Sequence, residues 1–102
     1  LVFAGARAVA ENIFVRVTLE SGAQGYGEIA PFPEVGGEDR PASLRAATDA
    51  SKTLRGQSVA QWTRLAHVLR EMIGGYPAAR CGLETAILDT FCHAASMPLW
   101  AL

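Results

Sequence analysis

Residues 12–30, Asn12-Ile-Phe-Val-Arg-Val-Thr-Leu-Glu-Ser-Gly-Ala-Gln-Gly-Tyr-Gly-Glu-Ile-Ala30, decide the fold because they predict a β-hairpin. From Ile13 to Leu19 apolar residues alternate with other residues, and β-branched and aromatic side chains are frequent, which is typical of a strand with one apolar face. Gly22 can adopt the positive φ of a turn. Residues 24–30 are therefore expected to return as a second, antiparallel strand.

A lone hairpin is only marginally stable in water, so this one needs a third strand or helices to cover it. The opening Leu1-Val-Phe3 is a candidate for the remnant of a third strand. Alternatively, another chain supplies that strand, because an exposed hairpin edge favours pairing.

Three helices are expected after the loop at residues 31–39, which contains two prolines and two glycines. The first begins at the N-cap Asp39, tolerates Pro41 in its first turn and ends at Gly56. The second opens with a capping box from Ser58 to Gln61 and ends at Gly74-Gly75, and the third runs from Pro77 to about Ala95. The residues expected to face inward are Leu44, Ala47, Ser51 and Leu54, then Trp62, Leu65, Leu69 and Met72, then Ala79, Leu83, Ala86, Ile87, Phe91 and Ala94.

The order of these elements predicts an α+β fold, in which a small antiparallel sheet packs on a three-helix bundle. A length of 102 residues fits a single domain, residues 1–102. Nine basic and ten acidic residues give a net charge of −1, so neither nucleic acid nor an anionic membrane surface is an expected partner. No apolar run approaches the roughly 20 residues that span a bilayer, and we expect a cytoplasmic protein.

Few residues are candidates for chemistry. Cys81 and Cys92 fall on one helix about 16 Å apart, too far for a disulfide, and are expected to be buried. His67 and His93 have no partner cluster and receive no role. No Ser-His-Asp set, metal cluster or pair of carboxylates on one face can be placed.

Two other patterns have structural explanations that we prefer. Glu34, Glu38 and Asp39 lack the spacing of a calcium loop, so a solvated loop followed by an N-cap is expected. Gly25 and Gly27 lie within a strand, which predicts a place where another element packs closely rather than a dinucleotide site.

Three segments together resemble a known family. Residues 12–22, residues 25–33 (Gly-Tyr-Gly-Glu-Ile-Ala-Pro-Phe-Pro) and residues 80–89 (Arg-Cys-Gly-Leu-Glu-Thr-Ala-Ile-Leu-Asp), followed by residues 97–102, resemble the N-terminal capping domain of muconate-lactonizing-type enzymes of the enolase superfamily. The resemblance spans nearly the whole chain. The segment at residues 29–33 is most similar to o-succinylbenzoate synthases and dipeptide epimerases, with chloromuconate cycloisomerases close behind.

The resemblance implies a partner domain, a (β/α)₇β barrel that holds Mg²⁺ through carboxylates and abstracts the proton α to a substrate carboxylate with a lysine. This chain has one lysine, Lys52, so no catalytic or metal residue is carried over and no cofactor is expected in the chain itself. The implied role is that of a lid that determines substrate specificity and is inactive alone. The alternative is a free-standing, non-enzymatic domain that forms a homo-oligomer or binds a ligand or protein partner.

Loops of the cap are expected to contact the substrate, and they correspond to residues 4–11 and 30–37. In the second loop the resemblance assigns the specificity wall to Pro31, Phe32, Pro33, Glu34 and Val35. Contacts with the barrel are expected from Glu84, Trp100 and Leu102, and an ion pair with Arg80 is the alternative for Glu84.

Overall fold

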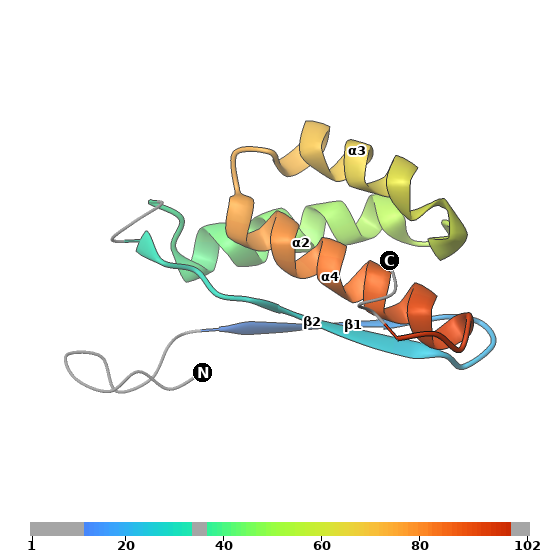
Figure 1. The fold of residues 1–102 in the computed structure, drawn as a ribbon. Coiled ribbons are helices and arrows are strands. Elements are labelled where there is room, and N and C mark those ends of the chain that lie inside the picture. The colour runs from blue at the N-terminus through green and yellow to red at the C-terminus, as the bar shows by residue number, and fades with distance from the viewer. Residues whose placement is uncertain (1–11, 34–36, 99–102) are drawn as a thin grey trace.

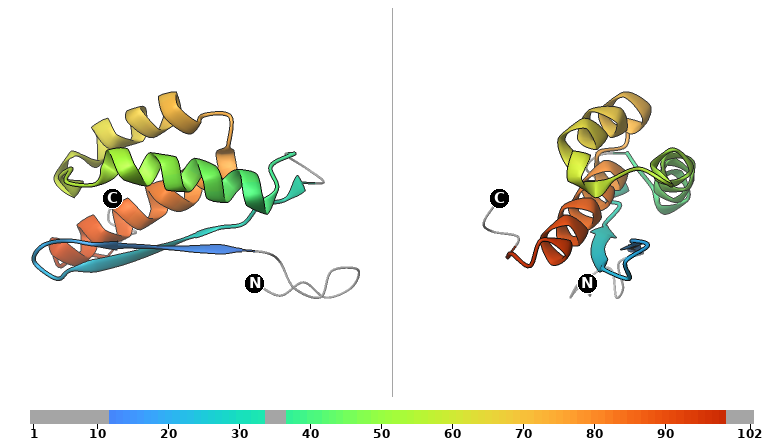
Figure 2. Two further views of the ribbon diagram at one scale, coloured as in Figure 1. Left: turned by 180° about the vertical axis from the view of Figure 1, so that it is seen from behind. Right: turned by 90° about the vertical axis from the view of Figure 1, so that its right-hand side faces the viewer.

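A computed structural model describes residues 12–33 and 37–98. The sheet consists of β1 (Ile13–Thr18) and β2 (Gln24–Ile29), and the helices are α2 (Arg40–Leu54), α3 (Trp62–Ile73) and α4 (Pro77–Ala94), with a 3₁₀ turn, η1 (Val59–Gln61), before α3. The hairpin forms one layer, α4 lies across it, and α2 and α3 cover the other side of α4 (Figures 1 and 2). The predicted α+β fold is confirmed. The proposed third strand at residues 1–3 lies outside the described residues.

The hairpin has the register that its alternating sequence predicts. β1 and β2 pair antiparallel from Ile13 opposite Ile29 to Thr18 opposite Gln24. Gly22 has a φ of 94° and donates its N–H to the carbonyl of Leu19 at 2.9 Å, which closes the turn. Odd-numbered residues of β1 are half-buried beneath the helices, whereas Phe14 on the opposite face is 76% exposed.

Glycines allow α4 to lie directly on β2. A Cβ on Gly25 would come within 2.2 Å of Thr90 Oγ1, and one on Gly27 within 2.0 Å of the Gly82 carbonyl oxygen. A Cβ on Gly82 would in turn come within 2.4 Å of Ile29 Cγ1. Any side chain at these positions would push the helix away from the sheet. The close packing predicted at Gly25 and Gly27 is confirmed, and the element that packs there is α4.

The core forms where the three helices meet the hairpin. Five residues that the sequence predicts to be buried are exposed instead: Leu44, Ser51, Met72, Cys81 and Ala94. Leu44 is 41% exposed and Ser51 is exposed, because α2 turns its small residues Ser43, Ala46, Ala47 and Ala50 inward, where they allow close contact between helices. Met72 is 43% exposed, since Ile73 continues the buried row that starts at Leu65 and Leu69. Cys81 is exposed on α4, and only Cys92 is buried; both are free.

The start of α3 also differs from the predicted capping box. The Ser58 hydroxyl accepts a hydrogen bond from the N–H of Ala60 at 3.3 Å, within the 3₁₀ turn. The Gln61 side chain does not return to the backbone, because its Oε1 accepts from Arg64 Nε at 2.9 Å. Arg64 also donates to Gln57 Oε1 at 2.6 Å, and this side-chain network replaces the box. Among the described helices, none combines the length and the apolar character that crossing a membrane requires.

Candidate functional site

The loop between β2 and α2 is the predicted substrate-contacting region. Pro31 at its start is buried, Phe32 is 43% exposed and Pro33 is exposed. The carbonyl of Pro33 accepts a hydrogen bond from the N–H of Gly37 at 3.0 Å, which brings the two described ends of the loop together. Glu34 and Val35, which the sequence analysis places in the specificity wall, lie outside the described residues.

Glu38 fixes the end of this loop to two helices, and it is only 5% exposed. Its Oε1 accepts from the N–H of Ala78 at 2.9 Å, and its Oε2 accepts from the N–H of Ala79 at 3.0 Å. The Ser43 hydroxyl, which is fully buried in α2, donates to the same Oε2 at 2.5 Å. The predicted solvated loop is therefore wrong at Glu38. No local pattern marks this residue, since the two amides lie 40 and 41 positions further along the chain.

The neighbouring carboxylate has the predicted role. Asp39 is the N-cap of α2, and its Oδ1 accepts from the N–H of Ala42 at 2.9 Å. Adjacent acidic residues thus serve two different helices: Asp39 caps the helix that follows it, and Glu38 caps the start of α4.

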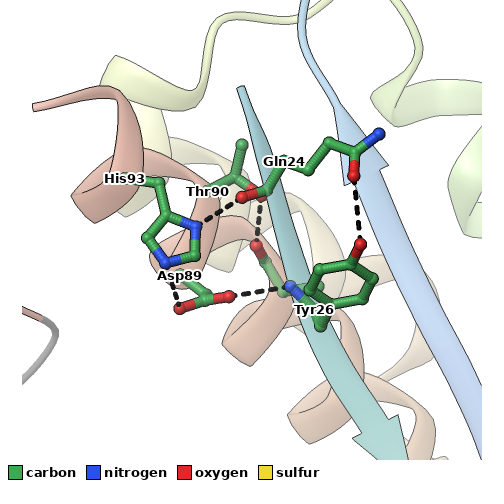
Figure 3. A network of polar contacts seen from close by, with 6 residues as sticks. Gln24, Tyr26, Asp89, Thr90 and His93 are labelled. Carbon is green, nitrogen blue, oxygen red and sulfur yellow. Dashed lines mark hydrogen bonds and ion pairs between the residues drawn. The ribbon is translucent and has the colours of Figure 1, made fainter. Parts of the chain in front are cut away.

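Side chains of α4 satisfy backbone groups of β2 on the edge away from β1 (Figure 3). Asp89 Oδ2 accepts from the N–H of Tyr26 at 2.8 Å, and His93 Nδ1 contacts the carbonyl oxygen of Gln24 at 2.5 Å. His93 Nε2 lies 3.6 Å from Asp89 Oδ1. Although aspartate and histidine are adjacent here, Nδ1 of His93 holds the helix to the sheet, and Nε2 faces Asp89 on the same helix. This explains His93 as a structural contact rather than a general base.

Glu84 lies on a different side of α4, toward α3. Its Oε1 is buried and has no hydrogen-bond partner among the described residues. It faces a groove of about 180 Å³ that is also lined by Trp62, Ala66, Arg70, Ile87 and Leu88. The ion pairs found in the described residues, Lys52 with Asp49 and His93 with Asp89, do not include the Arg80 alternative. Trp100 and Leu102, the other predicted barrel contacts, lie outside the described residues.

A second groove, of about 400 Å³, runs between β1 and the end of α2. Its wall combines aliphatic residues, among them Val15, Val17 and Leu54, with polar ones such as Arg16 and Gln57. In the part of the chain that the structure describes, no group of three or more His, Cys, Asp or Glu side chains could hold a metal ion. The described residues thus offer an anchored loop and two surface grooves.

A family model for the mandelate racemase / muconate lactonizing enzyme N-terminal domain matches residues 2–102. The chain belongs to this family. It is 42% identical over 98 residues to an aromatic dipeptide epimerase of Herpetosiphon aurantiacus, covering 96% of this chain and 28% of the relative. The mandelate racemase / muconate lactonizing domain thus spans little more than a quarter of that relative's length.

Solved structures of the family have the same fold. A mandelate racemase / muconate lactonizing protein from Sorangium cellulosum matches with a TM-score of 0.89 and 42% identity, over 98% of this chain and 28% of that one. A dipeptide epimerase from Cytophaga hutchinsonii, solved with Mg and the dipeptide D-Ala-L-Val, matches with a TM-score of 0.87 and 27% identity, over 93% of this chain and 26% of that one. Because these matches are to longer enzymes, the alternative of a free-standing module is not favoured.

Proposed function

We propose that this chain is the capping domain of a dipeptide epimerase, in which it closes over a barrel active site and selects the substrate. The observation that carries the proposal is the 42% identity to an aromatic dipeptide epimerase over 96% of the chain. The structure adds a physical reason: the loop after β2 presents Phe32 and Pro33 outward from a base fixed at Pro31 and Glu38. The exposed apolar side chains of Phe32 and Pro33 suit dipeptides with an apolar or aromatic residue.

The cap contributes binding and exclusion of water rather than proton transfer. Closing a loop over bound substrate removes water and strengthens the electrostatic interactions inside the site. A Mg²⁺ site does not fit the described residues, which lack the necessary ligand cluster. The proposal accordingly places the metal and the acid and base residues on the barrel, and no step is assigned to them in this chain.

Contact with the barrel is proposed for the α3–α4 groove that contains Glu84. A buried carboxylate oxygen without a donor is costly, so a hydrogen-bond donor is expected to reach it in the complete protein. An arginine or lysine of the barrel satisfies this requirement, and Trp62 offers such a cation an aromatic wall. The apolar Trp100 and Leu102 are proposed to belong to the same interface. We further propose a cytoplasmic protein that forms a homo-oligomer.

The proposal is tested by expressing the chain together with the sequence that follows it in its reading frame. With Mg²⁺ and a panel of L-Ala-X dipeptides in D₂O, we expect exchange of the α-proton of residue X, followed by mass spectrometry and by chiral chromatography. The 102-residue chain alone and the complete protein with EDTA serve as controls and are expected to be inactive. A reading frame without a barrel of about 250 residues, or a complete protein that exchanges no dipeptide α-proton, would contradict the proposal.

A further inference from the structure

The start of α4 has no capping side chain from the residues next to it in sequence. Its N-cap residue, Tyr76, makes no side-chain capping hydrogen bond, and the first helical residue is Pro77, which has no N–H. The free donors of the first turn therefore include the N–H groups of Ala78 and Ala79. Both donate to Glu38, which is 5% exposed and comes from a segment about 40 residues earlier.

A carboxylate suits this position for two reasons. The N-terminus of a helix carries a partial positive charge, and a single carboxylate can accept from two adjacent N–H groups at once. The buried hydroxyl of Ser43 supplies a third donor, so the charge of Glu38 is held by three hydrogen bonds from two helices. Charged hydrogen bonds of this kind have a narrow geometry, which fixes the backbone at residue 38 as well as the side chain.

The position of Glu38 in the chain links this contact to the loop. It follows Gly37, whose N–H closes the loop on the carbonyl of Pro33 at 3.0 Å. At the other end Pro31 is buried, two residues after Ile29, which is fully buried against α4. Both ends of the loop are thus held against α4. One end is held because β2 packs on the helix, and the other because Glu38 accepts hydrogen bonds from its first turn.

We propose that Glu38 is a positioning residue for substrate selection: by binding the start of α4, it sets where the described part of the loop, residues 31–33 and 37, stands. The inference rests on the proposed function for its effect on substrates, but the link from Glu38 to loop position stands on the contacts alone. Glu38 itself contacts no substrate in this proposal. It acts through the placement of Phe32 and Pro33.

The test compares Glu38→Gln with Asp39→Asn in the complete protein that contains this chain. Each variant removes one negative charge without changing side-chain size. The Asp39→Asn side chain still caps α2, whereas the Glu38→Gln side chain presents an amide group to three donors and can accept through only one oxygen. Two measurements are made on each variant: amide hydrogen exchange by mass spectrometry, and kcat/KM for L-Ala-L-Phe and L-Ala-L-Ala.

For Glu38→Gln we expect exchange to become about tenfold faster at the amides of Ala78 and Ala79 and at the loop amides of Phe32 and Gly37, corresponding to a loss of about 1.4 kcal/mol. We also expect the ratio of kcat/KM for the two dipeptides to change by on the order of tenfold, since a displaced loop affects the bulky substrate most. A variant that only unfolds more easily would lower both values equally and leave the ratio unchanged. Asp39→Asn is expected to change neither measurement.

The outcomes separate the two proposals. Unchanged exchange at the amides of Phe32 and Gly37 in Glu38→Gln, or an equal effect of Asp39→Asn, overturns the positioning role. Faster exchange with an unchanged substrate ratio overturns its link to substrate selection. If the wild-type protein turns over no dipeptide, the proposed function fails, and faster loop exchange in Glu38→Gln alone would still support the control of loop position by Glu38.

Discussion

Glu38 and Glu84 both have buried carboxylate oxygens beside α4, but only Glu38 accepts hydrogen bonds there from the described residues. Glu38 accepts three hydrogen bonds of 2.5–3.0 Å from Ser43, Ala78 and Ala79. Glu84 Oε1 has no hydrogen-bond partner among the described residues, although it is buried. The difference shows which carboxylate is held by the described residues themselves, and Glu84 is the one for which we propose a donor from outside them.

The largest expected effect is that of Glu38→Ala. Removing the carboxylate leaves two buried backbone N–H groups and a buried hydroxyl without their acceptor, and we expect the free energy of unfolding to fall by about 3 kcal/mol. Urea denaturation followed by circular dichroism measures this change. A loss below about 1 kcal/mol would mean that water replaces the carboxylate, and Glu38 would then be no more essential to the fold than Glu84.

Glu84→Met is expected to act in the opposite direction. Methionine has a helix propensity similar to that of glutamate and fills the groove beside Trp62 with apolar atoms, so the unpartnered oxygen disappears. We expect the 102-residue chain to be stabilised by about 1 kcal/mol in the same urea experiment.

In the complete protein the same substitution is expected to weaken the contact between cap and barrel, because it removes the acceptor for the proposed donor. Limited proteolysis between the two domains, which should be faster in the variant, measures this contact. Glu84→Gln is the control, since it keeps an oxygen acceptor while losing the charge. If Glu84→Met destabilised the chain by itself, Glu84 would be an internal contact like Glu38, and the contrast between them would disappear.

The sequence predicts the elements of this fold better than it predicts their contacts. The hairpin with its turn at Gly22 and the N-cap Asp39 depend on residues a few positions apart, and both are confirmed. The predicted inward face of α2 is right at Ala47 and Leu54 but wrong at Leu44 and Ser51, because a helix with several alanines has more than one possible packing face and the tertiary neighbour decides between them. Here the small face, rather than the face with Leu44, packs inward.

The candidate site shows the same limit more strongly. The close approach at Gly25 and Gly27 has a local signal, two glycines within a strand, and its prediction is confirmed. Glu38 has none, since its partners Ala78 and Ala79 are about 40 residues away and donate through backbone groups that nearly every residue has. A buried acid bound by backbone amides can be recognised only when the tertiary structure is known.

Ser43→Ala tests the third donor of Glu38 and is expected to have a smaller effect. The hydroxyl is fully buried and donates to a charged oxygen that keeps its two backbone donors, so we expect a loss of about 1 kcal/mol in unfolding free energy. Ser51→Ala on the same helix is the matched control, because that hydroxyl is exposed and bonds only to the carbonyl of Thr48 at 2.8 Å. A control that loses as much stability as Ser43→Ala would show that the bond to Glu38 adds nothing.

Asp39→Asn has the smallest expected effect. It decides whether the stabilisation by Glu38 comes from its hydrogen bonds or from its negative charge. The side chain is exposed and accepts one hydrogen bond, from the N–H of Ala42, which an asparagine oxygen can accept equally well. We therefore expect the free energy of unfolding to change by less than about 0.5 kcal/mol at low salt, and by less still at high salt, where exposed charges are screened. If Asp39→Asn cost as much as Glu38→Gln, the long-range field of the acidic pair would stabilise the helices. The three short hydrogen bonds of Glu38 would then not explain its importance.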